Sequence, residues 1–207
     1  MNTSFPILDV TEYCLPLDDL CEVFGNGKRT ALEIGFGEGD FLIEMAKRKI
    51  DWNFVGIEIK RKRFNKAVKR AQREKTNNVK LLLMDARIAV EEVFSQDTFS
   101  EMYINFPDPW PKDRHKKHRI INQKFLYELS CIMKPLAALE IASDHEEYIS
   151  HILEVFENME TFRSEFPSPG YVNSLPDRPM TKYELEFREE GREVYYLRLI
   201  NLKNQNL

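Results

Sequence analysis

Short apolar runs alternate with amphipathic patterns along most of this 207-residue chain. The runs predict strands, and the patterns between them, with apolar residues every three or four positions, predict helices. The predicted strands are 30–34, 53–59, 79–84, 101–105, 136–143 and 193–202, and the predicted helices are 38–49, 61–75, 86–94, 121–134 and 145–158. Such alternation favours an α/β fold, with a mainly parallel sheet and helices on both of its faces.

Length and composition limit the class of protein. With 207 residues, 43% of them hydrophobic, the chain can bury one core, so we expect a single domain. It has no run of 18 apolar residues and no basic start followed by an apolar run, so we expect no membrane span, no secretory signal and a cytoplasmic location. Cys14, Cys21 and Cys131 lack CxxC spacing, which argues against disulfides and a zinc site.

Charge is unevenly distributed along the chain. The net charge is −4, yet residues 60–75 carry nine Lys or Arg and one Glu, and residues 112–119 carry five and one Asp. Local positive surface of this kind attracts phosphates. A surface helix with the apolar stripe Phe64, Ala67, Val68 and Ala71 facing the core explains 60–75 equally well, so the sequence leaves its role in RNA binding open.

A glycine-rich turn follows the first predicted strand. Gly35, Gly37 and Gly39 have the spacing G-x-G-x-G, whereas a dinucleotide fingerprint needs G-x-G-x-x-G. Glu38 and Asp40 would repel a pyrophosphate and tolerate a cationic sulfonium. The turn therefore favours S-adenosylmethionine (AdoMet) over NAD.

Four acids stand at or just after the ends of successive predicted strands: Glu33, Glu58, Asp85 and Asp108. Carboxylates there could bind a methionine ammonium, ribose hydroxyls and an adenine amino group, in that order for the first three. Each acid alone is explained as well by a helix N-cap or a surface charge. Together they predict one rim around a nucleoside cofactor.

The segment 105–119 joins a carboxylate to a basic run. Three prolines around Asp108 and Trp110 predict a stiff, extended loop, because each ring fixes its own φ and restricts the residue before it. The basic run that follows suits phosphates. A proline turn leading into a solvated basic helix is the competing interpretation.

The irregular, proline-rich segment near 167–179 is a candidate lid or substrate wall.

The string Asn-Phe-Pro-Asp-Pro-Trp-Pro-Lys at 105–112, followed by Arg-His and further basic residues, resembles the signature of the bacterial tRNA (guanine-N7-)-methyltransferases. The resemblance implies a Rossmann-like class I AdoMet methyltransferase fold with an antiparallel C-terminal strand. It implies AdoMet as cofactor, tRNA as partner and methylation of guanosine N7 in the variable loop. Residues 1–207 would form one domain, with a short N-terminal segment at 1–28 and a substrate-side loop at 167–184; a homodimer is a state open to it.

The same resemblance implies roles for individual residues. Asp108 would be catalytic, and the cofactor would be bound by Glu33, Gly35, Gly37, Gly39, Glu58, Asp85, Ala86 and Asp108. The substrate would be bound by Lys112, Asp144, Thr181, Lys182, Tyr183 and Glu184, and RNA by Arg114, His115, Lys116, Lys117, His118 and Arg119. The pattern departs at His118, where Arg is usual, and at Ser143, where Thr is common. The segment before Phe24 is short, so tRNA contacts of a longer N-terminal extension are expected to be missing.

Guanine N7 carries a lone pair and no proton, so methyl transfer needs positioning and tolerance of developing positive charge but no general base. Two other classes compete. An amino-methyltransferase would use Asn/Asp-Pro-Pro-aromatic, which the insertion after Asn105 disfavours; a non-catalytic RNA-binding subunit would not need the glycine turn and the acids. His115 and His118 have no third ligand, so we expect no metal.

Overall fold

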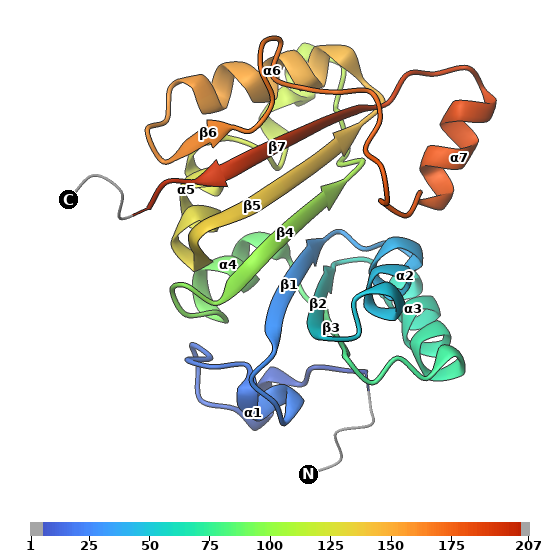
Figure 1. The fold of residues 1–207 in the computed structure, drawn as a ribbon, viewed down its shortest axis with the longest axis vertical. Helices are drawn as coiled ribbons and strands as arrows, with labels where there is room; N and C mark the ends of the chain where they lie inside the picture. The colour runs from blue at the N-terminus through green and yellow to red at the C-terminus, as the bar shows by residue number, and fades with distance from the viewer. Residues whose placement is uncertain (1–5, 204–207) are drawn as a thin grey trace.

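Seven strands form one sheet in the order β3-β2-β1-β4-β5-β7-β6 in the computed structural model, which describes residues 6–203 (Figure 1). The five strands β3, β2, β1, β4 and β5 are parallel, and β7 is antiparallel to both of its neighbours. The strand bounds are β1 Arg29–Ile34, β2 Trp52–Glu58, β3 Val79–Leu83, β4 Phe99–Asn105, β5 Met133–Ser143, β6 Phe162–Ser164 and β7 Tyr195–Asn201. The mainly parallel sheet with an antiparallel C-terminal strand is confirmed.

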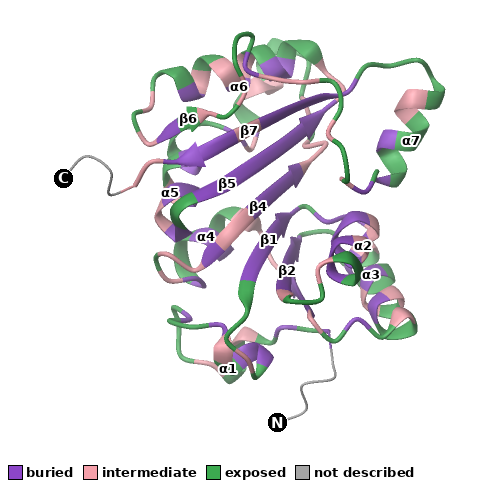
Figure 2. Cartoon of the chain, viewed as in Figure 1, coloured by how far each residue is buried: buried purple, intermediate pink, exposed green. Residues whose placement is uncertain are grey.

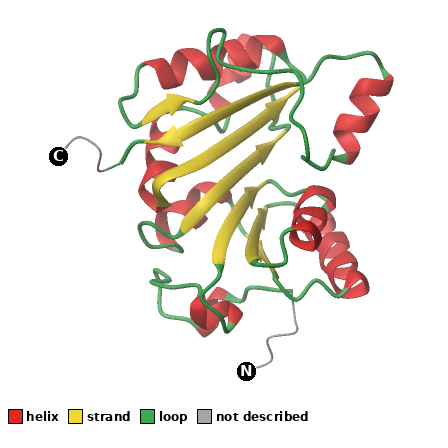
Figure 3. Ribbon diagram, in the orientation of Figure 1, coloured by secondary structure: helices red, strands yellow, loops and turns green. Residues whose placement is uncertain are grey.

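Helices cover both faces of this sheet (Figure 3). Apolar residues of α2 and α3 pack on one face, and those of α4, α5 and α6 pack on the other. Successive residues of β1 illustrate the division, because Ala31 belongs to the first core and Leu32 to the second. The helix bounds are α1 Cys21–Phe24, α2 Asp40–Arg48, α3 Arg61–Glu74, α4 Ala86–Glu92, α5 Gln123–Ile132, α6 Glu146–Glu157 and α7 Lys182–Glu189, with 3-10 turns η1 Val10–Glu12 and η2 Asp113–His118.

The N-terminal segment lies against the sheet and α4. Its backbone bonds to β3, where Leu8 N donates to Leu81 O at 2.9 Å, and to the end of α4, where Leu17 N donates to Val93 O at 2.7 Å. Residues 1–5 of the predicted 1–28 segment lie outside the described residues. Within 6–203, no helix combines the length and the apolar character that crossing a membrane requires.

Among the α-helices and strands of residues 6–203, three are absent from the sequence prediction: α1, β6 and α7. The helix α1 has only four residues. The strand β6 has only three residues, and the only buried residue of α7 is Glu184, so α7 has no apolar stripe to reveal it. The segment 105–111 contains no helix, as predicted, but it is not extended throughout. Phe106 and Trp110, each before a proline, have φ of 50° and 43°. Both residues with positive φ make ring contacts: Phe106 packs against Phe187, and Trp110 packs against His115 and His118.

Most of the sheet is buried, and its parallel strands end at one edge (Figure 2). The chain leaves β1 and β4, which are neighbours in the sheet, toward opposite faces: β1 leads to α2 on one face, and β4 leads through η2 to α5 on the other. A crevice at such a point, beyond the carboxyl ends of the strands, is where open α/β sheets bind ligands.

Candidate active site

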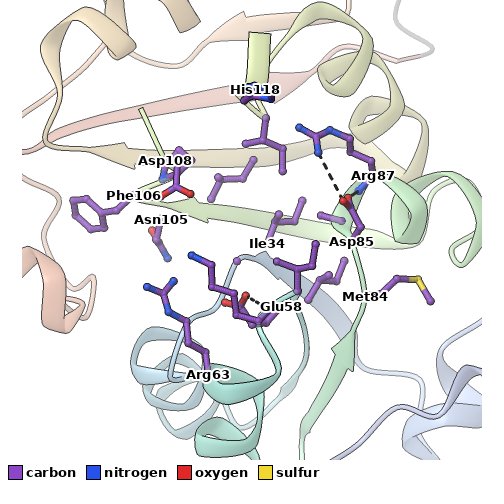
Figure 4. A pocket seen from close by; sticks show the side chains of 18 of the residues that line it. Ile34, Glu58, Arg63, Met84, Asp85, Arg87, Asn105, Phe106, Asp108 and His118 are labelled. Carbon is purple, nitrogen blue, oxygen red and sulfur yellow. Dashed lines mark hydrogen bonds and ion pairs between the residues drawn. The ribbon is translucent and has the colours of Figure 1, made fainter. Parts of the chain in front are cut away.

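A cavity of about 510 Å³ opens at this edge of the sheet (Figure 4). Four successive parallel strands contribute to its wall through the residues that end them or follow them. The lining residues include Ile34, Gly35, Ile57, Glu58, Lys60, Arg63, Met84, Asp85, Ala86, Arg87, Ile104, Asn105, Phe106, Asp108, Trp110, His115 and His118. The volume lies within the range of small-molecule sites.

The glycine turn is fastened to the end of β2. Gly37 has a φ of 60°, and its N–H donates to Glu58 Oε2 at 3.0 Å. At Gly39, with a φ of 82°, a Cβ would come within 3.0 Å of Ala67 Cβ on α3. A side chain at Gly39 would therefore push the turn away from α3.

Glu58 and Asp85 line the cavity and also hold backbone in place. Glu58 is 4% exposed, and its second oxygen accepts a hydrogen bond from Lys60 N at 2.7 Å. Asp85 is the N-cap of α4, because its Oδ1 accepts from Arg87 N at 2.8 Å. The N-cap interpretation of Asp85 is thus correct, and it does not exclude a ligand, since each carboxylate oxygen can accept a further hydrogen bond.

Glu33 does not line the cavity. It is 2% exposed and lies behind Asn105, whose Nδ2 donates to Glu33 Oε1 at 2.8 Å. Glu33 Oε2 is buried and has no hydrogen-bond partner among residues 6–203. Burial is the main cause that raises the pKa of Glu33 to about 7, against a lowering by the Asn105 hydrogen bond. The four predicted acids therefore do not form one exposed rim.

The shifted pKa of Glu33 makes stability depend on pH. Its value in the unfolded chain is 4.5, so the contribution of protonated Glu33 is complete below pH 4.5 and is lost as the pH rises through about 7. Glu33→Gln cannot ionise. We expect its free energy of unfolding, measured in urea without cofactor, to rise relative to the unsubstituted protein between pH 5 and 8. A difference that stays constant over this range would contradict the shifted pKa.

Asp108 is exposed at the cavity and makes no side-chain hydrogen bond or ion pair with any other described residue. A hydrogen bond fixes the loop that carries Asp108, because Arg119 Nε donates to Pro109 O at 2.8 Å. Figure 4 shows Asp108 beside Asn105 and Phe106 at the end of β4. The carboxylate is therefore held at the cavity by backbone constraints.

Comparisons with known proteins agree with this geometry. The family model described as "Putative methyltransferase" matches residues 27–197. A tRNA (guanine-N(7)-)-methyltransferase of Cronobacter sakazakii is 33% identical over 95% of this chain and 82% of its own length. Its counterpart in Thermotoga maritima is 36% identical over 94% of this chain, which spans 63% of that relative. The chain belongs to the tRNA (guanine-N(7)-)-methyltransferase family.

Solved structures resemble the fold of this family member at lower identity. A 30S ribosomal A1408 methyltransferase from an uncultured bacterium aligns with a TM-score of 0.62 and 19% identity over 94% of both chains. A SAM-dependent methyltransferase from Aquifex aeolicus aligns with a TM-score of 0.59 and 16% identity, covering 97% of this chain and 92% of that one. At these identities the likeness concerns the fold alone.

The residues of the basic run that resembles the family's RNA-contacting segment have four different environments. Arg114 and Lys117 are exposed, and the rings of His115 and His118 lie 5.7 and 5.5 Å from that of Trp110 at the cavity. Lys116 pairs with Asp113 and Glu147. Arg119 corrects the prediction: it is 2% exposed, with its guanidinium 4.9 Å from the Tyr148 ring, so it supports the loop and is not accessible to RNA.

The predicted substrate residues of the family's C-terminal motif lie on and around α7. Thr181 is the N-cap of α7 and accepts from Glu184 N at 3.0 Å, while Lys182 lies 3.7 Å from Glu186. Tyr183 accepts from Arg63, a cavity residue of α3, at 3.0 Å. None of the predicted substrate residues Lys112, Asp144, Thr181, Lys182, Tyr183 and Glu184 lines the cavity.

The two acids among the predicted substrate residues, Asp144 and Glu184, form ion pairs within the protein. Asp144, after β5, forms an ion pair with Arg192. Glu184 is 1% exposed and accepts from Arg178 and Arg188, both at 3.1 Å, and from the Tyr196 hydroxyl. Glu184 therefore fixes α7 to the sheet in this structure.

Arg178, whose side chain is 6% exposed, is a residue that the sequence interpretation missed. Its Nε donates to Glu140 on β5 at 2.5 Å, and Nη2 donates to Asn105 at the end of β4. The guanidinium carbon lies 4.6 Å from the centre of the Phe41 ring and 4.9 Å from that of Tyr196. A single Arg in a proline-rich loop gives no sequence signal of such contacts. Arg178 links the segment 167–184 to the strands β4 and β5.

Proposed function

We propose that this chain transfers a methyl group from AdoMet to N7 of a guanosine in the variable loop of tRNA. Membership of the tRNA (guanine-N(7)-)-methyltransferase family supports the proposal. The observation that carries it is the carboxylate of Asp108, which pairs with no other residue in 6–203. A short proline-rich loop holds it at a cavity lined by polar residues from the ends of successive strands. We further propose that the chain acts as one domain, 1–207, in the cytoplasm, where tRNA is its partner.

The residues around the cavity fit AdoMet, which supplies a methyl group on a sulfonium. Glu58 would accept hydrogen bonds from the ribose hydroxyls and Asp85 from the adenine amino group. The buried, unpartnered Oε2 of Glu33 suits the ammonium of the methionine moiety, provided that the intervening Asn105 admits it. The glycine turn Gly35–Gly39, together with Ala86, would let the cofactor approach the backbone closely.

The chemistry on guanine needs charge stabilisation more than proton transfer. Methyl transfer would form the bond to N7 and break the methyl–sulfur bond, with the neutral thioether S-adenosylhomocysteine as leaving group. The positive charge would thereby pass to the base, where the Asp108 carboxylate at the cavity would stabilise it. Asp144 would accept a hydrogen bond from guanine N1–H or the amino group with the oxygen lone pairs left over from its ion pair with Arg192. Glu184, 1% exposed and paired with Arg178 and Arg188, would support α7 at the substrate side. Thr181, Lys182, Tyr183 and Lys112 would form the wall toward the substrate.

Product analysis tests the proposed reaction directly. Unmodified tRNA is incubated with AdoMet labelled in the methyl group, and the product is then treated with borohydride and aniline, which cut RNA at N7-methylguanosine. We expect labelled tRNA that is cut in the variable loop. Labelled RNA that resists cleavage would place the methyl group on another atom, and absence of label despite AdoMet binding would indicate a binding subunit.

Cofactor binding gives a separate prediction. Glu58→Ala should weaken AdoMet binding by about 1 to 3 kcal/mol, because a buried ribose loses its charged acceptor and Gly37 N loses its partner. Isothermal titration calorimetry measures the change. Glu91→Ala, an exposed acid on α4 that does not line the cavity, serves as the control and should bind AdoMet normally. Equal affinities for the two variants would remove Glu58 from the cofactor site.

A further inference from the structure

The structure separates the nine cations of residues 60–75 into those that the protein uses internally and those that it does not. Lys66 pairs with Glu38, Arg70 with Asp40 and Glu74, and Arg73 with Glu74. Arg63 donates to Tyr183. The remaining five have no side-chain hydrogen bond or ion pair with any residue in 6–203: Lys60, Arg61, Lys62, Lys69 and Lys75. More than half of the cations are thus available to a partner.

Three of these unpaired cations stand at the end of α3 that borders the cavity. Lys60, which lines the cavity, directly precedes Arg61 and Lys62 in the first turn. At about 100° per residue, Arg61, Lys62 and Lys69 lie within about 100° of one another around the helix axis. The buried residues Phe64, Ala67 and Ala71 occupy the opposite side. The cations therefore form an exposed stripe that runs from the mouth of the cavity along α3.

Stability does not explain this stripe. The first turn of α3 contains no acid, and no side chain caps its N-terminus. Cations near the positive end of a helix dipole are unfavourable, and adjacent like charges repel one another. Such a departure from local electrostatic preference is expected where a polyanion binds.

A second group of cations lies across the cavity. Lys112, Arg114 and Lys117 are exposed and have no ion pair among the described residues, and they belong to the segment whose histidines line the cavity. In Figure 4, Arg63 of α3 and His118 of this segment lie on opposite sides of the cavity. An RNA that inserted one base into the cavity would continue on both sides of it, with phosphates near each group.

We propose that the α3 stripe, formed by Lys60, Arg61, Lys62 and Lys69, is a second phosphate-contact surface for tRNA, opposite the 112–117 group. This inference rests on the proposed function, since it assumes that the target base enters the cavity. The partner follows from charge complementarity: the stripe is cationic, elongated and continuous with the cavity, as a flexible phosphodiester backbone requires.

The salt dependence of tRNA binding tests the surface without turnover. In the test variant, Arg61, Lys62 and Lys69 are replaced by Gln; none of them lines the cavity. The control variant replaces Lys28, Lys75 and Lys134 by Gln. These residues are exposed and lie toward the amino ends of the strands, and the variant loses the same three positive charges as the test variant. At about 0.7 per phosphate contact, we expect the log–log slope of affinity against salt to fall by about 2 in the test variant and to stay unchanged in the control.

The outcomes separate this inference from the proposed reaction. Equal slopes in the test variant, the control and the unsubstituted protein would overturn the proposal that the α3 stripe contacts phosphates, even if N7-methylguanosine forms. Conversely, a reduced slope in the test variant alone supports the surface even if the methyl group is found on another atom. AdoMet affinity should be the same in both variants, which checks that the cavity is intact.

Charge reversal distinguishes binding from a structural role. Acidic residues in the first turn of a helix are stabilising, so Arg61→Glu together with Lys62→Glu should raise the melting temperature while weakening tRNA binding further. A lower melting temperature would mean that the two cations serve the fold, and it would overturn the inference.

Discussion

Replacing Asp108 by Asn should leave the fold and AdoMet binding intact and slow methyl transfer about 100-fold or more, as when an enzyme loses one electrostatic contact to its transition state. The substitution keeps the shape of the side chain and removes its charge. No described residue pairs with Asp108, so the folded protein loses no internal contact. Single-turnover transfer from labelled AdoMet to tRNA measures the rate of the chemical step.

The control for this experiment is Asp51→Asn, an exposed acid that precedes β2 at the opposite edge of the sheet. It should transfer methyl groups at the unsubstituted rate. If Asp108→Asn also retains that rate, then charge on Asp108 does not stabilise the transition state. If its AdoMet affinity falls as much as its rate, Asp108 binds the cofactor and has no separate effect on the reaction.

Among the substitutions proposed here, Arg178→Met should cause the largest loss of stability, about 3 to 5 kcal/mol in the free energy of unfolding. Removing one partner of a buried ion pair leaves the other charge uncompensated. Here Glu140 and Glu184, 5% and 1% exposed, would both lose a donor, and Asn105 at the end of β4 would lose its contact with the loop. Urea unfolding measures the loss.

Two variants sharpen this prediction. Arg48→Met removes a guanidinium that pairs with the partly exposed Glu44 and donates to Asp177 O of the same loop, and it should cost at most about 1 kcal/mol. Adding Glu184→Gln to Arg178→Met should restore part of the stability, because it removes one unpaired buried charge. An Arg178→Met loss no greater than that of Arg48→Met would mean that the buried network contributes little.

Patterns of residues close together in the sequence predicted much of the fold and part of the candidate site. Apolar runs and helical patterns predicted all five parallel strands and five of the helices. A strand buried on both faces of a sheet is apolar along its whole length, and a helix packed on one side repeats its apolar residues every 3.6 positions. Because parallel strands end at a common edge, acids at strand ends such as Glu58, Asp85 and Asp108 were expected at one cavity, and all three line it.

Only the tertiary structure decided the roles that depend on partners far apart in the sequence. Arg178 is 73 residues from Asn105 and 38 from Glu140, and neither separation leaves a local pattern. The same holds for Arg119, which the loop and Tyr148 bury, and for Glu33, which Asn105 covers. A sequence records charge and polarity at each position, but burial and pairing are set by packing between segments, and these determine which cations reach RNA and which carboxylates remain free.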